Sequence, residues 1–89
     1  AFANWCVERA GYAGTDSAWA RSWLQWGVPT DKPREGCIVV LERGEGSGHV
    51  GFYVSSTPTE IRLLGGNQSD MVRESSYPRE RLMGYRLPS

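Results

Sequence analysis

The side chain with the widest range of chemistry in this chain of 89 residues is its single histidine, His49. It stands near the start of 48–54, where apolar and other residues alternate in the period-two pattern of a strand. The glycine-rich stretch 44–48 in front of it predicts a loop. An imidazole held by a strand and open to a substrate suits a general base, because its ordinary pKa lies near neutrality. The alternative is a surface or core histidine without chemistry.

The second stretch that could contribute to a site is Gly65-Gly66-Asn67-Gln68. Two glycines allow the backbone to turn sharply or to approach another group closely. If Asn67 ends a strand beside that of His49, its amide oxygen can accept a hydrogen bond from one ring nitrogen. That bond fixes the tautomer and leaves the other nitrogen to act on a nucleophile. The alternative is an ordinary Gly-Asn turn.

A histidine and an orienting amide still require a nucleophile. Ser47 directly precedes His49 but falls in the predicted loop, and Cys6 falls in the middle of a predicted helix on its apolar face. A thiol in that position is usually buried and inert, whereas a helix N-terminus lowers a thiol pKa. Cys6 and Cys37 could pair or both be free. With one histidine the chain offers no Cys/His zinc set, and no cofactor is predicted.

Two helices are predicted in the first third of the chain. Apolar residues gather on one face of 1–10, and Gly11 follows as an expected helix end. A second helix is predicted over 18–26. Three residues share one face of it: Trp19, Trp23 and Trp26. This spacing favours burial in the core, and stacking on sugar rings is the alternative.

Short strands are predicted in the remainder of the chain, over 37–41, 48–55, 60–64, 71–75 and 82–87. The connections between them are too short for crossovers, so neighbouring strands should be antiparallel. We therefore expect one α+β domain, with N-terminal helices packed on an antiparallel sheet of four to five strands. The first helix should contact the sheet through Phe2, Cys6 and Ala10.

The composition limits the range of partners. Ten basic and ten acidic residues cancel, and neither sign is clustered, which argues against nucleic acid or an anionic membrane as the main partner. The sequence has no apolar run near the ~20 residues of a membrane span and no recognisable signal peptide. The sequence by itself therefore indicates neither a location nor an oligomeric state.

Four segments, in this order, resemble papain-like bacterial cell-wall hydrolases of the NlpC and CHAP types. Residues 1–11 resemble the family's first helix, and 33–40 resemble its first strand with the turn that enters it. Residues 48–54 resemble the strand that carries the catalytic histidine, and 65–68 stand where the family has its third, orienting polar residue. The closing segment of one subfamily is also similar to 77–79 and 84–86. The resemblance implies a papain-like fold, a Cys-His-Asn site with His49 as base and Asn67 as orienting residue, and peptidoglycan peptides as substrate. It also implies a location in the cell wall or periplasm.

The chain departs from this pattern at its nucleophile. The family motif places the catalytic cysteine at the start of the first helix, which corresponds to two positions before Ala1. Cys6 does not match that position, and Cys37 stands where the family more often has Asp. We therefore expect 1–89 to be a single papain-like domain without its N-terminal segment and inactive by itself. The alternatives are a non-catalytic cell-wall-binding or phage structural module, and Cys6 as a substitute nucleophile.

Overall fold

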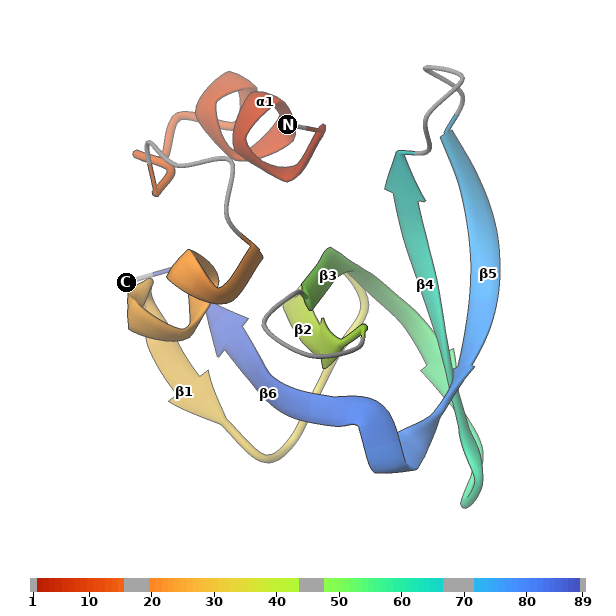
Figure 1. The fold of residues 1–89 in the computed structure, drawn as a ribbon. Helices are drawn as coiled ribbons and strands as arrows, with labels where there is room; N and C mark the ends of the chain where they lie inside the picture. Colours follow the sequence, from red (N-terminus) through yellow and green to blue (C-terminus); the bar gives the residue numbers. More distant parts are fainter. Residues whose placement is uncertain (1, 16–19, 44–47, 67–71, 89) are drawn as a thin grey trace.

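The fold is built on one antiparallel sheet of six strands in the order β1-β6-β2-β3-β4-β5 (Figure 1). The computed structural model describes residues 2–15, 20–43, 48–66 and 72–88. The strands are β1 (Val28–Thr30), β2 (Ile38–Glu42), β3 (Gly48–Ser56), β4 (Glu60–Gly66), β5 (Val72–Pro78) and β6 (Leu82–Leu87). The predicted α+β class and the consecutive antiparallel order of β2, β3 and β4 are confirmed.

In the described parts of the chain, three short helices accompany the sheet: α1 (Phe2–Arg9) and the 3₁₀ helices η1 (Ala20–Gln25) and η2 (Arg79–Arg81). The end of α1 follows from its sequence. Gly11 adopts a φ of 93°, and the N–H groups of Gly11 and Tyr12 donate to the carbonyls of Glu8 and Val7. This is the hydrogen-bond pattern of a Schellman motif. Glycine is the preferred residue at the position of positive φ in this motif, because it lacks a Cβ atom. The predicted role of Gly11 as a helix end is confirmed.

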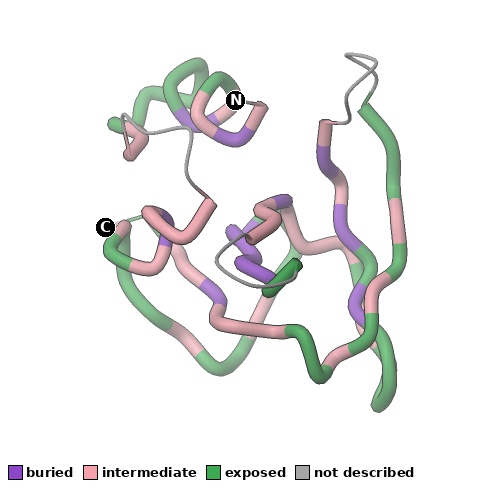
Figure 2. The backbone as a smooth tube through the Cα atoms, viewed as in Figure 1, coloured by how far each residue is buried: buried purple, intermediate pink, exposed green. Residues whose placement is uncertain are grey.

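The sheet has a hydrophobic cluster on each face, and β2 contributes to both. The outer cluster joins α1 and η1 to the sheet through Ala3, Val7, Trp23, Ile38 and Val40. The inner cluster lies on the opposite face and comprises Cys37, Val39, Leu41, Ile61, Leu63 and Tyr85. Because the sheet bends, side chains from β6 and β4 meet in the inner cluster (Figure 1). Figure 2 shows the resulting burial along β2, β4 and the sheet-facing side of α1.

The predicted count of four to five strands is wrong, because the described sheet contains six. The additional strand is β1, three residues that pair with the end of β6. Its central residue, Pro29, has no N–H to donate, and proline is tolerated in an edge strand of this kind. Three residues are too few to show an alternating pattern, so the sequence offered no strand signal there.

Two details of the predicted helices also need correction. The contact of α1 with the sheet uses Ala3 and Val7 as its buried residues, whereas Cys6 is partly buried and Ala10, beyond the last helical residue, is exposed. The segment predicted as a second α-helix is a 3₁₀ helix over Ala20–Gln25 where it is described, and 16–19 lie outside the described residues.

The predicted burial of the tryptophans is confirmed for Trp23, whose side chain is 1% exposed. Trp26 is half-buried; its ring centroid lies 4.9 Å from that of Trp23, and its Nε1–H donates to the Ala13 carbonyl at 2.7 Å. Trp19 lies outside the described residues. Trp23 therefore has a structural role between η1 and the sheet.

Trp23→Ala is expected to lower the free energy of unfolding by about 3–5 kcal/mol, because it removes a fully buried indole and leaves a cavity beside β2. Chemical denaturation followed by circular dichroism measures this change.

The matched control is Trp5→Ala, at a tryptophan that is 58% exposed and stacks under the Arg9 guanidinium. Its loss should cost about 0.5–1 kcal/mol, the range for an exposed cation–π contact. Equal losses for the two variants would contradict a core role for Trp23.

Candidate active site

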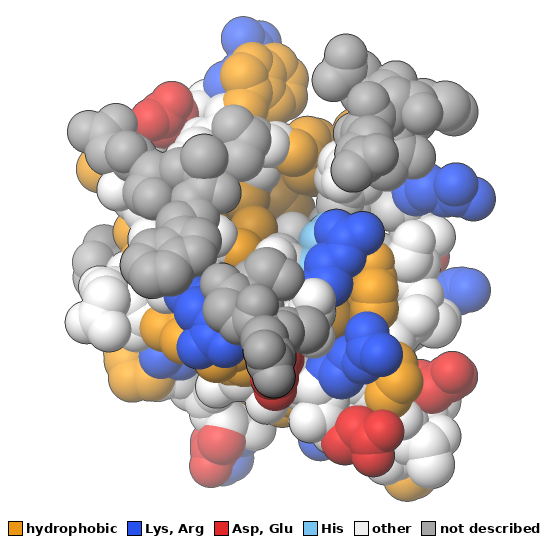
Figure 3. Space-filling view, in the orientation of Figure 1, with side chains coloured by type: hydrophobic (Ala, Val, Ile, Leu, Met, Phe, Trp, Pro, Cys, Tyr) orange, Lys and Arg blue, Asp and Glu red, His pale blue; other side chains and the backbone are white. Residues whose placement is uncertain are grey.

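His49 is the second residue of β3 and is partly buried. It pairs with Leu41 of β2, and residues directly opposite each other in a ladder share a face. Leu41 belongs to the inner cluster, so the imidazole lies on the inner face of the sheet, opposite the face that α1 covers. The predicted place of His49 at the start of a strand is confirmed. Histidine surface is visible next to Lys or Arg in Figure 3.

A tyrosine from a different strand holds the imidazole. The Oη atom of Tyr77 lies 3.3 Å from Nε2 of His49, and the two ring centroids are 5.2 Å apart at an interplanar angle of 40°. Tyr77 belongs to β5, which is separated from β3 by β4. Sequence reasoning did not assign Tyr77 to the site. The two residues are 28 positions apart, and no local pattern relates them.

The end of β4 passes directly beside this pair. A Cβ atom added at Gly65 would lie 3.5 Å from Nε2 of His49, which is an ordinary contact distance. A Cβ atom added at the next residue, Gly66, would lie 2.9 Å from Cβ of Phe2, which is too close. The last two residues of β4 thus face opposite ways, Gly65 towards His49 and Gly66 towards the first turn of α1.

The second predicted site residue, Asn67, lies outside the described residues, and so does Ser47. The structure therefore does not test the predicted contact between Asn67 and His49. In the sequence Asn67 follows Gly66 directly.

The environment of His49 favours its neutral form. Burial lowers the pKa of the imidazole below its ordinary value, and the positive charge of Arg43 lowers the pKa further. A neutral imidazole has one nitrogen that carries a proton and one that can accept a proton. His49 is therefore in the state that a general base requires at neutral pH.

Neither cysteine is suitably placed to react with His49. Both are free thiols, and burial raises the pKa of each. Cys37 directly precedes β2 and is four residues from Leu41, the partner of His49, which corresponds to about 13 Å of extended chain. Cys6 belongs to α1, whose buried residues pack on the outer face. Within the described ranges, neither thiol combines a lowered pKa with a place beside the imidazole.

The described residues show neither a metal centre nor a membrane-spanning helix. No group of three or more His, Cys, Asp or Glu in them could hold a metal ion. No helix formed by these residues is long and apolar enough to cross a bilayer.

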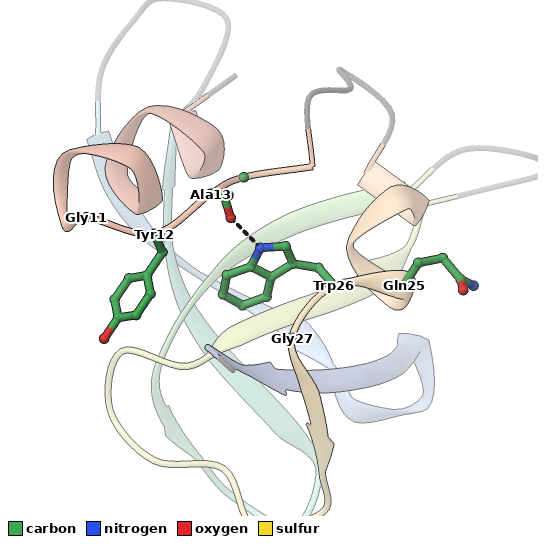
Figure 4. Close-up of a pocket in the computed structure, with 7 residues that line it drawn as sticks. Gly11, Tyr12, Ala13, Gln25, Trp26 and Gly27 are labelled. Atoms are coloured by element: carbon green, nitrogen blue, oxygen red, sulfur yellow. Dashed lines mark hydrogen bonds between the residues drawn. The ribbon is translucent and has the colours of Figure 1, made fainter.

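A separate cavity of about 460 Å³ opens between the segment after α1 and the end of η1 (Figure 4). Its lining comprises Gly11, Tyr12, Ala13, Gly14, Gln25, Trp26 and Gly27. The hydrogen bond from the Trp26 indole to the Ala13 carbonyl joins its two sides. Among the described residues, this lining includes no histidine, cysteine or carboxylate, so the candidate for catalysis remains the site around His49.

Comparison with known proteins places most of the chain in one family. A family model for the CHAP domain matches residues 1–67. The match spans α1 and the strands β1 to β4, and it includes both His49 and Asn67. Tyr77, in β5, lies beyond it. No curated protein and no solved structure matches the chain.

Acidification is expected to destabilise the folded chain through His49. The pKa of this imidazole is lowered in the folded state, whereas it is about 6.5 in an unfolded chain. Between these two values the unfolded state binds more protons, so the free energy of unfolding falls as the pH drops through 6.5. It should level off below the folded pKa. Denaturant titrations at a series of pH values, from about 7.5 down to about 5.5, measure this slope.

The control variant is His49→Gln, which keeps a polar side chain and cannot be protonated. Because the chain has no other histidine, the variant should lose the part of the slope that belongs to imidazole. The same slope in both proteins would show that the pKa of His49 is not lowered by folding.

Proposed function

This chain belongs to the CHAP domain family, and on that premise we propose that it is a peptidoglycan hydrolase that cleaves amide bonds in cell-wall peptides. CHAP domains are generally amidase or peptidase hydrolases, and their substrate is peptidoglycan. The observation that carries the proposal is the contact of His49 with Tyr77. It gives a partly buried imidazole of lowered pKa a hydrogen-bonding partner at one of its two nitrogens. The chemistry is that of a cysteine peptidase with a papain-like Cys-His-Asn site.

In the proposed reaction a cysteine thiol gives its proton to His49 while its sulfur attacks the carbonyl carbon of the amide. Backbone N–H groups at the start of α1 donate hydrogen bonds to the resulting oxyanion. His49 then gives the proton to the leaving amine as the C–N bond breaks, which leaves a thioester on the sulfur. Water, deprotonated by His49, attacks the thioester and releases the carboxylic acid and the thiol.

The cysteine proposed for this role is the one that the family spacing puts two positions before Ala1. Two placements support that position. Gly66 faces Phe2, the first residue of α1, and the preceding residue of β4, Gly65, faces His49. The start of α1 and the imidazole thus approach the same end of β4 from opposite sides. A thiol at a helix N-terminus also has a lowered pKa, in contrast to Cys6.

Asn67 is proposed as the orienting amide of the site. The support is its place in the chain: it follows the two glycines whose backbone lies between His49 and Phe2. An amide oxygen there can share with the Tyr77 hydroxyl the single N–H of the neutral imidazole, without adding a charge. The proposal thereby keeps the role that the family motif assigns to this position.

A non-catalytic cell-wall-binding or phage structural module is the second candidate. It is favoured by one observation: within the described residues, neither Cys6 nor Cys37 is placed to give a proton to His49. The two functions differ in whether a cysteine is present at the family position before Ala1.

The proposed enzyme is tested by release of soluble peptides from purified peptidoglycan. Residues 1–89 alone should release none, because His49 has no thiol to activate. A longer chain that carries a cysteine two positions before Ala1 should be active. His49→Ala in that chain should abolish activity, because the thiol then has no base.

Three controls complete the experiment. Serine in place of the upstream cysteine should abolish release, whereas Cys6→Ser in the longer chain should leave release unchanged. Activity of residues 1–89 that is lost on Cys6→Ser would make Cys6 the nucleophile. A longer, cysteine-containing chain that binds peptidoglycan and releases nothing would support the binding module.

A further inference from the structure

The geometry points to Tyr77 as a positioning residue: its hydroxyl holds His49 at Nε2 and leaves Nδ1 as the nitrogen that accepts the thiol proton. This inference rests on the proposed function for its catalytic meaning. The contact itself can be measured without any reaction.

The first support is that Tyr77 restrains the imidazole in two ways. Its hydroxyl lies 3.3 Å from Nε2, and its ring packs against the imidazole ring with centroids 5.2 Å apart. The hydrogen bond is slightly longer than the usual N–H···O range, as catalytic hydrogen bonds often are before a substrate binds. A ring contact combined with a hydrogen bond limits both the tilt and the rotation of the imidazole.

The second support is that Tyr77 and β4 meet the same edge of the imidazole. The position of a Cβ atom at Gly65 is 3.5 Å from Nε2 and 3.8 Å from Cε1. The Tyr77 hydroxyl and the Gly65 backbone thus both face the Nε2 edge of the ring, with room for a methyl group between Gly65 and Nε2. Nδ1 is the other ring nitrogen and is the one left for a nucleophile.

The third support comes from the other tyrosines around the inner cluster. The Tyr53 hydroxyl lies 2.6 Å from the Ser56 hydroxyl, and the buried Tyr85 hydroxyl has no hydrogen-bond partner among the described residues. Tyr77 is the tyrosine of this face whose hydroxyl reaches the imidazole. Its strand fixes its position, because Tyr77 pairs with Ile61 of β4, a fully buried residue.

The chemical role of Tyr77 follows from proton balance. Before reaction, Nε2–H of the neutral imidazole donates to the Tyr77 oxygen, and Nδ1 has a free lone pair. When Nδ1 takes the thiol proton, His49 becomes an imidazolium and Nε2–H still donates to the same oxygen. Tyr77 neither gains nor loses a proton in this step. It fixes the tautomer and the ring orientation, and it does not touch the substrate.

Nitrogen-15 NMR of the labelled 89-residue chain tests the contact directly, because the only imidazole signals are those of His49. At neutral pH we expect the proton on Nε2 and none on Nδ1. In Tyr77→Phe the Nε2–H proton should exchange with water at least about tenfold faster, since the hydrogen bond is lost while the phenyl ring remains.

A control variant separates Tyr77 from its neighbours. Tyr53→Phe removes a hydroxyl from the same face, one that contacts Ser56, and should leave the exchange rate unchanged. A proton found on Nδ1 in the unmodified chain would overturn the proposal without the need for any variant to fold. Loss of protection in Asn67→Ala and not in Tyr77→Phe would overturn it as well.

A kinetic test in the longer, cysteine-containing chain adds the catalytic readout. Tyr77→Phe should lower kcat by about 10- to 100-fold with KM nearly unchanged, because a misoriented base slows the reaction without weakening substrate binding. An unchanged kcat would overturn the positioning role. Absence of hydrolysis in the unmodified longer chain would overturn the proposed function, while the NMR result would still decide the contact between Tyr77 and His49.

Discussion

The structure depends on the burial of β2 on both of its faces. Residues 38–41 of this strand are almost fully inaccessible, with even-numbered side chains in the outer cluster and odd-numbered ones in the inner cluster. The outer face of β2 therefore anchors α1 and η1. Its inner face, through Leu41, fixes the register of His49. A shift of one residue would exchange the two faces and move the imidazole to the helix side of the sheet.

The sequence allowed the part of the fold that depends on local pattern to be predicted. The continuous apolar run at 37–41 indicated a buried strand, and the alternation after His49 indicated its neighbour. Gly11 indicated the end of the first helix. The pattern failed for β1, where three residues are too few to show alternation and the partner is the distant β6.

The candidate site likewise has one residue that local sequence pattern identifies and one that it does not. His49 was identifiable because its type, its place at a strand start and the glycines before it are local features. The contact with Tyr77 was not, because it joins β3 to β5 across β4. Tyr77 also pairs with Ile61, four residues along β4 from Gly65, so the contact with His49 runs diagonally over the inner face. A contact of this kind, which depends on the pairing of three strands, is not encoded in a single segment.

The two glycines at the end of β4 separate the start of α1 on one face of the sheet from the imidazole on the other. Neighbouring residues of a strand point to opposite faces, so Gly65 meets His49 on one side and Gly66 meets Phe2 on the other. At Gly66 the missing side chain lets Phe2 approach the backbone, whereas at Gly65 a Cβ atom would be in ordinary contact with His49. In the proposed enzyme, a nucleophile that precedes α1 therefore has to meet His49 from the opposite face of the sheet.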